Sequence, residues 1–165
     1  MVLKKNIGLD DVLDTPYELK VGEKTYYIQY PPMGLVAMIE AKRTKIVNTD
    51  TKYMTMYMEK LSTFNNVDKK EAEKIEKELE NLLKEFITEK FDIVAEMVQL
   101  IIEGKKPDGN WKVSKDEIMW EWSVDKVLEV IEVYEKMIDV NDFFSKVIKK
   151  KEENQKQIGE NSSSH

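Results

Sequence analysis

The segment DKKEAEKIEKELENLLKEFITEKF, residues 68–91, constrains the fold of this chain more than any other part of the sequence. Its apolar residues recur every three or four positions among alternating charges, which is the period of an amphipathic α-helix. They are Ile75, Leu79, Leu82, Leu83, Phe86 and Ile87. The helix either continues through 92–103 or breaks near 88–92, and Gly104 with Pro107 ends it in both cases.

The N-terminal part of the chain has a different period. In YELKVGEKTYYIQY, residues 17–30, apolar residues alternate with polar ones, which predicts a β-hairpin with one apolar face and a turn at Gly22. Pairing Val21 with Tyr26 sets Leu19 opposite Ile28 and Tyr17 opposite Tyr30. A register shifted by two residues buries the same face, so the alternation alone leaves the register open.

The tandem prolines at 31 and 32 end the second strand and open a helix. This helix is expected over residues 33–46, with Leu35, Met38 and Ile39 turned toward the hairpin. Residues 47–61 have apolar residues at helical spacing, but threonine and asparagine disfavour a helix, so a separate short helix followed by a loop at 62–66 is expected.

The C-terminal part begins with a polar loop at 105–113. Ser114 and Ser123 have the spacing of helix caps, which predicts a short turn over 114–122 and a helix over 124–139. A last short helix after Asn141 would carry Phe143, Phe144, Val147 and Ile148. The expected fold is therefore α+β and predominantly α-helical, with an N-terminal β-hairpin packed on a helical bundle.

The expected organisation is one globular domain over residues 1–148. Residues 1–32 form its N-terminal segment with the hairpin, and residues 33–148 form its helical part. Residues 149–165 are polar and lack apolar residues to bury, which predicts a solvated and partly disordered tail. The first residues lack the apolar core of a signal peptide, so a cytoplasmic protein with no membrane contact is expected.

Composition excludes most enzyme chemistry. The 165 residues include no cysteine, and the one histidine is the last residue, His165. Thiol catalysis, serine or cysteine triads and histidine-based zinc sites all need residues that this chain lacks. The net charge is −6, with both signs interspersed and no basic stripe for nucleic acid. We expect no enzyme, no cofactor and no metal; a carboxylate-dependent enzyme is the distant alternative.

Two helical segments have more apolar surface than a surface helix needs. In residues 92–103 the polar residues Asp92, Glu96, Gln99 and Glu103 form one narrow line, and in residues 123–139 Asp125, Glu129, Glu132 and Lys136 form another. Such helices are either central helices wrapped by the rest of the fold, or they carry a surface for an apolar partner. The partner could also be another copy of the chain, and the nine methionines suit an adaptable apolar surface.

Trp120 and Trp122 cannot share one face of a helix, because they lie about 200° apart. We expect Trp122 to pack at the start of helix 124–139, and Trp120 to lie nearer the surface as a binding anchor. The acidic residues Glu117, Glu121 and Asp125 recur every fourth position, but acidic residues at helix starts are ordinary, so they are a weak metal or acid/base candidate.

The layout as a whole resembles the tail assembly chaperones of long-tailed bacteriophages and related phage-like elements. The resemblance rests on the N-terminal YELKVGEKTYYIQYPPMGLVAMIE, a charged helical middle, and VSKDEIMWEWSVDKVLEVIEVYEKMIDVNDFFSKV before a polar tail. It covers most of residues 10–150 and rests on layout, since the family has no invariant motif.

The resemblance implies a non-enzymatic protein of the bacterial host cytoplasm. It would bind the tape measure protein, an apolar helical client, and assist polymerisation of the tail tube protein. A structural adaptor that stays in the virion is the alternative. The expected partner-binding residues are Trp120, Trp122, Val127, Val130, Val133, Tyr134, Met137, Phe143 and Phe144.

Overall fold

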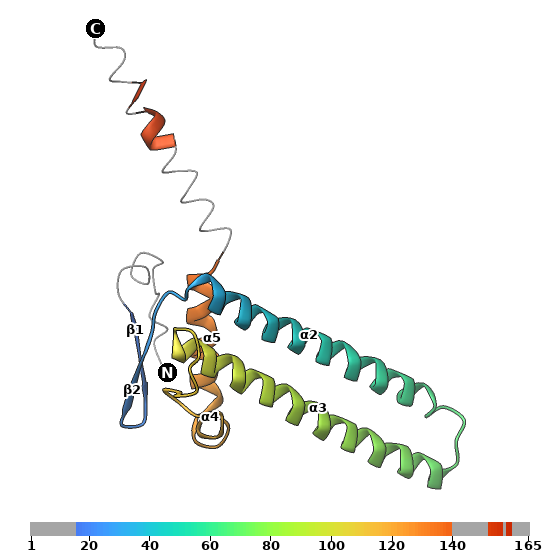
Figure 1. Ribbon diagram of the computed structural model, residues 1–165. Helices are drawn as coiled ribbons and strands as arrows, with labels where there is room; N and C mark the ends of the chain where they lie inside the picture. Colours follow the sequence, from blue (N-terminus) through green and yellow to red (C-terminus); the bar gives the residue numbers. More distant parts are fainter. Residues whose placement is uncertain (1–15, 140–151, 157, 160–165) are drawn as a thin grey trace.

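The computed structural model describes residues 16–139, 152–156 and 158–159. It confirms the α+β, predominantly helical fold with an N-terminal hairpin packed against helices. The elements are β1 (Tyr17–Val21), β2 (Lys24–Ile28), α2 (Met33–Ser62), α3 (Lys69–Glu103), α4 (Lys115–Glu121) and α5 (Val124–Met137). Figure 1 shows α2 and α3 as a long antiparallel pair, whose far end projects away from the β-hairpin, α4 and α5.

The β-hairpin has the second of the two registers that the alternation allows. Tyr17 pairs with Ile28, Leu19 with Tyr26 and Val21 with Lys24, so our expected pairing of Tyr17 with Tyr30 is wrong. This register leaves a two-residue turn with Gly22 at φ 60°, and glycine at the first turn position is what a type II′ hairpin turn requires. The buried face is the expected one.

Helix α2 is longer than the sequence suggested. It begins after Pro32, whose carbonyl accepts hydrogen bonds from the backbone N–H groups of Leu35 and Val36, and it continues without a break to Ser62. The separate short helix is therefore wrong, because packing on α3 buries Thr49 and Tyr53 and outweighs their low helix propensity. Met38, expected to face the hairpin, is 43% exposed.

Helix α3 runs unbroken from Lys69 to Glu103, so the chain takes the continuous alternative. The Asp68 side chain accepts a hydrogen bond from the backbone N–H of Glu71 (2.8 Å) and caps its start. Gly104 ends it in the left-handed conformation, at φ 68°. A Cβ on Gly104 would lie 3.2 Å from the side chain of Gln29, so both the positive φ and this close approach disfavour other residues here.

Helices α4 and α5 start where their serines predict. The Ser114 and Ser123 hydroxyls accept hydrogen bonds from the backbone N–H groups of Glu117 and Lys126. Helix α5 ends at Met137, two residues before the expected end. The predicted helix carrying Phe143 lies outside the described residues. In the tail, residues 152–156 and 158–159 are exposed as expected but helical, which suits their glutamate, lysine and glutamine.

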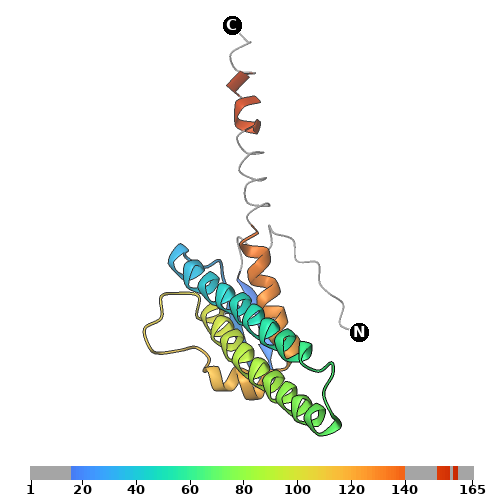
Figure 2. The same cartoon turned by 90° about the vertical axis from the view of Figure 1, so that its right-hand side faces the viewer.

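The core lies where the β-hairpin, α4 and α5 surround the base of the α2–α3 pair. Residues of α3 near its end are buried on all sides, as Ala95, Val98, Ile101 and Ile102 are each at most 3% exposed. The other members come from every element: Leu19, Tyr26, Ile28, Leu35, Ile39, Met97, Leu100, Val113, Ile118, Trp122, Val130, Val133, Tyr134 and Met137. Figure 2 shows α5 and the β-hairpin behind the α2–α3 pair.

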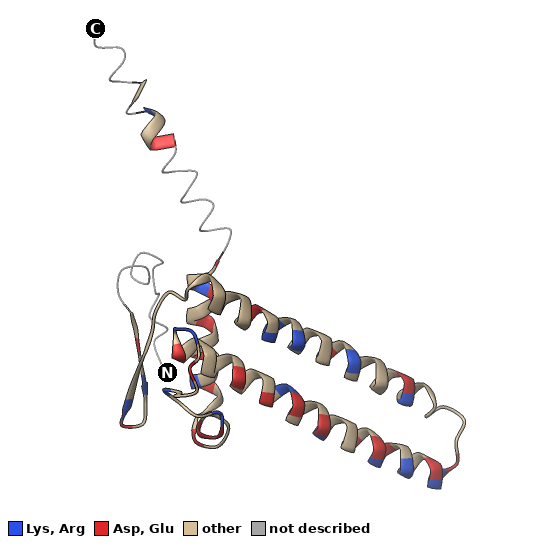
Figure 3. Ribbon diagram, viewed as in Figure 1, with Lys and Arg blue, Asp and Glu red and all other residues tan. Residues whose placement is uncertain are grey.

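Away from this base, α2 and α3 pack only on one another. Their contacts follow an antiparallel register, with ion pairs Lys42–Glu96, Asp50–Lys90 (2.9 Å) and Lys60–Glu78 (2.9 Å). The rings of Tyr53 and Phe86 meet at 5.3 Å between these pairs. Figure 3 shows lysines, arginines and acidic residues along both helices. This outer part of the pair is therefore joined by charges and few buried apolar side chains.

Candidate partner-binding surface

Five of the nine expected partner-binding residues lie inside the protein. Trp122, Val130, Val133, Tyr134 and Met137 are at most 8% exposed and belong to the core. They contact the chain's own β-hairpin and helices, so they present no surface to a partner in this conformation, and that part of the expectation is corrected. Most of the apolar residues of helix 124–139 therefore pack against α3 and the β-hairpin.

Trp122 joins the β-hairpin to α4, as its predicted packing role requires. Its ring lies 5.4 Å from that of Tyr26, centroid to centroid. The Tyr26 hydroxyl donates to the Glu117 carboxylate (2.8 Å), which also accepts from the Lys24 ammonium (3.1 Å). These hydrogen bonds hold the pKa of Glu117 below its usual value, while burial and the same bond raise the pKa of Tyr26 to about 12.

Two further tyrosines tie α5 into the fold through carboxylates. Tyr134 donates to Glu40 on α2 (2.9 Å), and Tyr17 on β1 donates to Glu129 (2.6 Å). Burial, followed by these hydrogen bonds, raises the pKa of both hydroxyls, that of Tyr17 to about 12. Both tyrosines are therefore neutral donors near neutral pH, and their role is to fix α5 in place.

The polar line of α3 is also used within the chain. Glu96 pairs with Lys42 and Lys115, and Asp92 with Lys115 (3.0 Å). Further along, Gln99 donates to the carbonyl of Val113 (3.0 Å), and buried Glu103 accepts from the backbone N–H of Lys112 (2.9 Å). The narrow polar line of this helix therefore fixes α2, α4 and the loop before α4.

Three large apolar residues that remain at the surface lie within nine residues of one another, at the end of α4 and the start of α5. Trp120 is 84% exposed, Val124 68% and Leu128 56%. We call these three the Trp120 patch. Val127 lies beside it, half-buried, and Phe143 and Phe144 lie outside the described residues. Trp120 thus occupies the exposed position expected of an anchor, while Val124 and Leu128 were absent from the expected site.

A second apolar surface lies on the projecting part of α2 and α3, and sequence reasoning missed it. We call it the hairpin face, after the helical hairpin that α2 and α3 form; it is not part of the β-hairpin. Its side chains are each 37–59% exposed: Val47, Met54, Tyr57, Met58, Leu61, Leu83, Ile87 and Phe91. The sequence pattern placed Leu83 and Ile87 in one apolar stripe with Leu82, but an antiparallel pair of helices covers only the narrow seam of each helix. The apolar stripe is wider than this seam, and that excess width could have indicated an exposed apolar surface.

The acidic candidates do not converge. Glu117 is engaged by Tyr26 and Lys24, whereas Glu121 and Asp125 lie exposed on different helices. Within the described residues, no group of histidine, cysteine and acidic side chains could hold a metal ion. Over the same part of the chain, none of the helices combines the length and apolar character needed to cross a bilayer.

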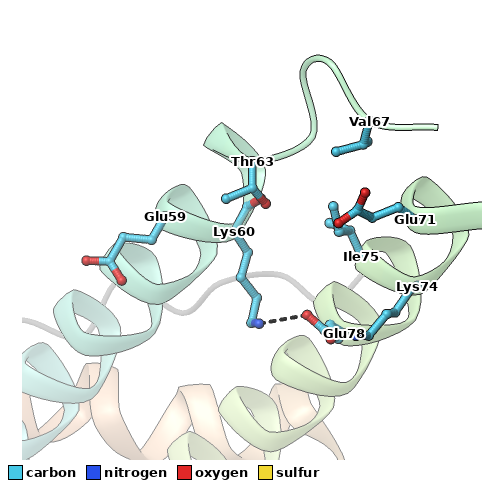
Figure 4. Close-up of a pocket in the computed structure, with 8 residues that line it drawn as sticks. All are labelled: Glu59, Lys60, Thr63, Val67, Glu71, Lys74, Ile75 and Glu78. Atoms are coloured by element: carbon cyan, nitrogen blue, oxygen red, sulfur yellow. Dashed lines mark hydrogen bonds and ion pairs between the residues drawn. The ribbon is translucent and has the colours of Figure 1, made fainter.

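Two open hollows lie on the α2–α3 pair. Figure 4 shows the first, of about 460 Å³, where the end of α2 meets the start of α3. Its Lys60 points to Glu78, and the other charged residues lining it are Glu59, Glu71 and Lys74. The second, of about 630 Å³, includes Glu89, which accepts from the Tyr53 hydroxyl (2.6 Å). In each hollow one carboxylate, Glu78 or Glu89, thus pairs with a donor of the chain itself.

Comparisons with protein-family models, with curated proteins and with solved structures find no match to this chain. Its surfaces therefore have to be interpreted from their own chemistry. They offer two apolar areas, the Trp120 patch and the hairpin face, and most of the polar groups described above form hydrogen bonds or ion pairs within the fold.

Proposed function

We propose that the protein is a non-enzymatic assembly chaperone that binds an apolar helical client, as the resemblance to phage tail assembly chaperones implies. The client would be a tape measure protein, and the outcome would be assembly of the tail tube around it. The observation that supports this proposal is the Trp120 patch, with its tryptophan 84% exposed. Tryptophan is usually well buried, and exposed tryptophans are common anchors at protein interfaces.

The patch suits a client helix in its size and chemistry. Val124 and Leu128 lie one turn apart on α5 and share a face, because residues four apart are neighbours on a helix. With Trp120 they give three large apolar side chains within nine residues, enough to hold one or two turns of an amphipathic helix. Around them, Glu121, Ser123 and Asp125 are exposed and supply a polar rim.

The test is co-expression with the tape measure protein of the same phage or phage-like element. The wild-type chain should form a complex with the client and raise its soluble fraction. Replacing Trp120 and Leu128 together by glutamate should abolish both effects, because charges would be desolvated on binding. The control Trp111→Glu changes a tryptophan that is 39% exposed in the loop before α4, and it should retain both.

Absence of a complex with the wild-type chain would end the chaperone proposal. Stoichiometric amounts of the chain in purified particles would favour the structural adaptor, since a chaperone leaves after assembly. These two measurements separate the functions without any assumption about which residues make the contact.

A further inference from the structure

The hairpin face lies on one side of the α2–α3 pair. Asp50 and Lys90 face each other at one flank of the seam (2.9 Å), and one heptad further from the base the same register sets Tyr57 opposite Leu83. Val47, Met54 and Leu61 on α2, like Ile87 and Phe91 on α3, follow on the same flank at helical spacing. Seven of the eight members therefore follow this flank, and Met58, four residues after Met54, lies beside Met54 toward the side of α2 that faces away from α3.

This surface continues the side on which α5 packs. Arg43, one heptad before Asp50, pairs with Glu135 of α5 (2.9 Å), and Glu40 accepts from Tyr134 of α5. Near the base, α5 is thus the third helix laid on this flank of the pair. Further out, none of the described residues takes its place, and the apolar side chains stay exposed.

The side of α2 that faces away from α3 has no charged residue along the projecting part of the helix. From Thr44 to Ser62 its exposed outward residues are valine, asparagine, threonine, methionine, leucine and serine. Of the charged residues in the same stretch, Asp50, Lys52 and Lys60 form ion pairs with α3, and the exposed Lys45 and Glu59 lie on the heptad line of Lys52, away from the apolar residues. Since 35% of the chain is charged, an uncharged helix side of this length indicates a surface that is buried in an assembly.

The pattern is symmetric about the middle of the surface. On α2, Val47 and Leu61 lie seven residues either side of Met54, and on α3, Leu83 and Phe91 lie four residues either side of Ile87. The contact of Tyr53 with Phe86 places Met54 and Ile87 within about 3 Å of the same level along the pair. A two-fold axis across the pair at this level maps the surface onto itself, as an isologous contact requires.

We propose that the hairpin face is the surface through which two copies of this chain associate. Each copy's α2 packs antiparallel on the partner's α2, with Met54 on Met54, and each α3 on the partner's α3, with Ile87 on Ile87. The four helices form a bundle, and the two bases lie at its opposite ends. The net charge of −6 makes two copies of the chain repel each other, but the uncharged side of α2 brings no like charges into the contact.

The available area suits a dimer. Eight side chains of roughly 150–200 Å² each, about half exposed, present on the order of 600–800 Å², close to the ~800 Å² per partner of a standard interface. The outer seam buries Tyr53, Ile75 and Leu82, but Thr49, Lys60 and Glu89 also lie along it, so the pair buries limited apolar surface there by itself. A second pair supplies the missing apolar layer.

Cysteine cross-linking of the full chain tests this arrangement directly, because the natural sequence has no cysteine. Under mild oxidation Met54→Cys should yield a disulfide-linked dimer, since the two-fold axis brings the two sulfurs together. Ile87→Cys should behave likewise. The control Asn81→Cys, exposed on the opposite flank of α3, should stay monomeric on a non-reducing gel.

Light scattering after gel filtration gives the second readout. The wild-type chain should have twice the monomer mass of 19.4 kDa, and Met54→Lys with Ile87→Lys should restore the monomer while keeping the wild-type circular dichroism spectrum. A wild-type monomer at concentrations on the order of 100 μM would overturn the proposal, as would equal cross-linking of Met54→Cys and Asn81→Cys. Neither result depends on a client, so dimerisation and the chaperone function can fail separately.

Discussion

Replacing Trp122 by alanine should destabilise the protein by about 4 kcal/mol. Trp122 is 8% exposed and lies against Tyr26, whereas Trp120, two residues earlier, is 84% exposed. Truncation removes on the order of 150–200 Å² of buried apolar surface, which at ~25 cal/mol per Å² gives about 4–5 kcal/mol. This agrees with the range of about 3–5 kcal/mol for truncating a buried tryptophan to alanine.

The assay is urea denaturation followed by far-UV circular dichroism, because fluorescence would lose its probe. With an m-value of about 2 kcal/mol/M, the midpoint should fall by roughly 2 M at unchanged m. Trp120→Ala is the matched control and should change the free energy of unfolding by less than about 0.5 kcal/mol. All variants are compared at one protein concentration, since association adds to apparent stability.

Similar losses of unfolding free energy for Trp122→Ala and Trp120→Ala would refute this account of how the core is packed. So would a loss below about 1 kcal/mol for Trp122→Ala, because a buried tryptophan packed against the β-hairpin cannot be removed at so small a cost. A changed m-value with an unchanged midpoint would point instead to an altered unfolded state.

Three further predictions concern helix ends and charge. Gly104→Ala should destabilise the protein by about 1–2 kcal/mol in thermal unfolding, because φ is 68° there. The control is Gly34→Ala, where an added Cβ meets open space at the start of α2; it should be neutral or stabilise the protein by up to about 1 kcal/mol. Asp68→Ala should cost about 1 kcal/mol in the same assay through loss of the cap. Burial alone would raise the pKa of Glu96, but the hydrogen bond from Lys42 outweighs it and holds this pKa below its usual 4.5. The stability that this pair contributes should therefore be complete above pH 4.5 and fall as the pH drops below it. In urea titrations over this pH range, Glu96→Gln should lose less unfolding free energy than the wild type.

Local chemistry in the sequence was sufficient for the ends of most elements. The prolines before α2 and the serines before α4 and α5 act within one turn of themselves, so the sequence predicted these helix starts without tertiary structure. Helical geometry predicted that Trp120 and Trp122 would not share one face, and the structure places Trp120 at the surface and Trp122 in the core.

The candidate surface was less predictable from the sequence. An apolar helix side indicates burial, but it cannot say whether the chain's own elements or a partner cover it. Helix α5 proved to be covered mostly by the β-hairpin and α3, which removed five residues from the expected site. The hairpin face was overlooked because residues 47–61 were expected to be a separate short helix; only packing on α3 extends α2 to Ser62 and exposes this side.

By itself, the sequence determined the fold class, the order of the elements and most of their limits, because periodicity and capping act over a few residues. The tertiary structure decided the register of the β-hairpin, the continuity of α2 and α3, and which apolar side chains remain at the surface. These depend on contacts between residues far apart in the chain, such as Lys42 with Glu96 and Tyr26 with Trp122. Such contacts form only when several elements pack at once, so a pattern within one segment cannot encode them alone.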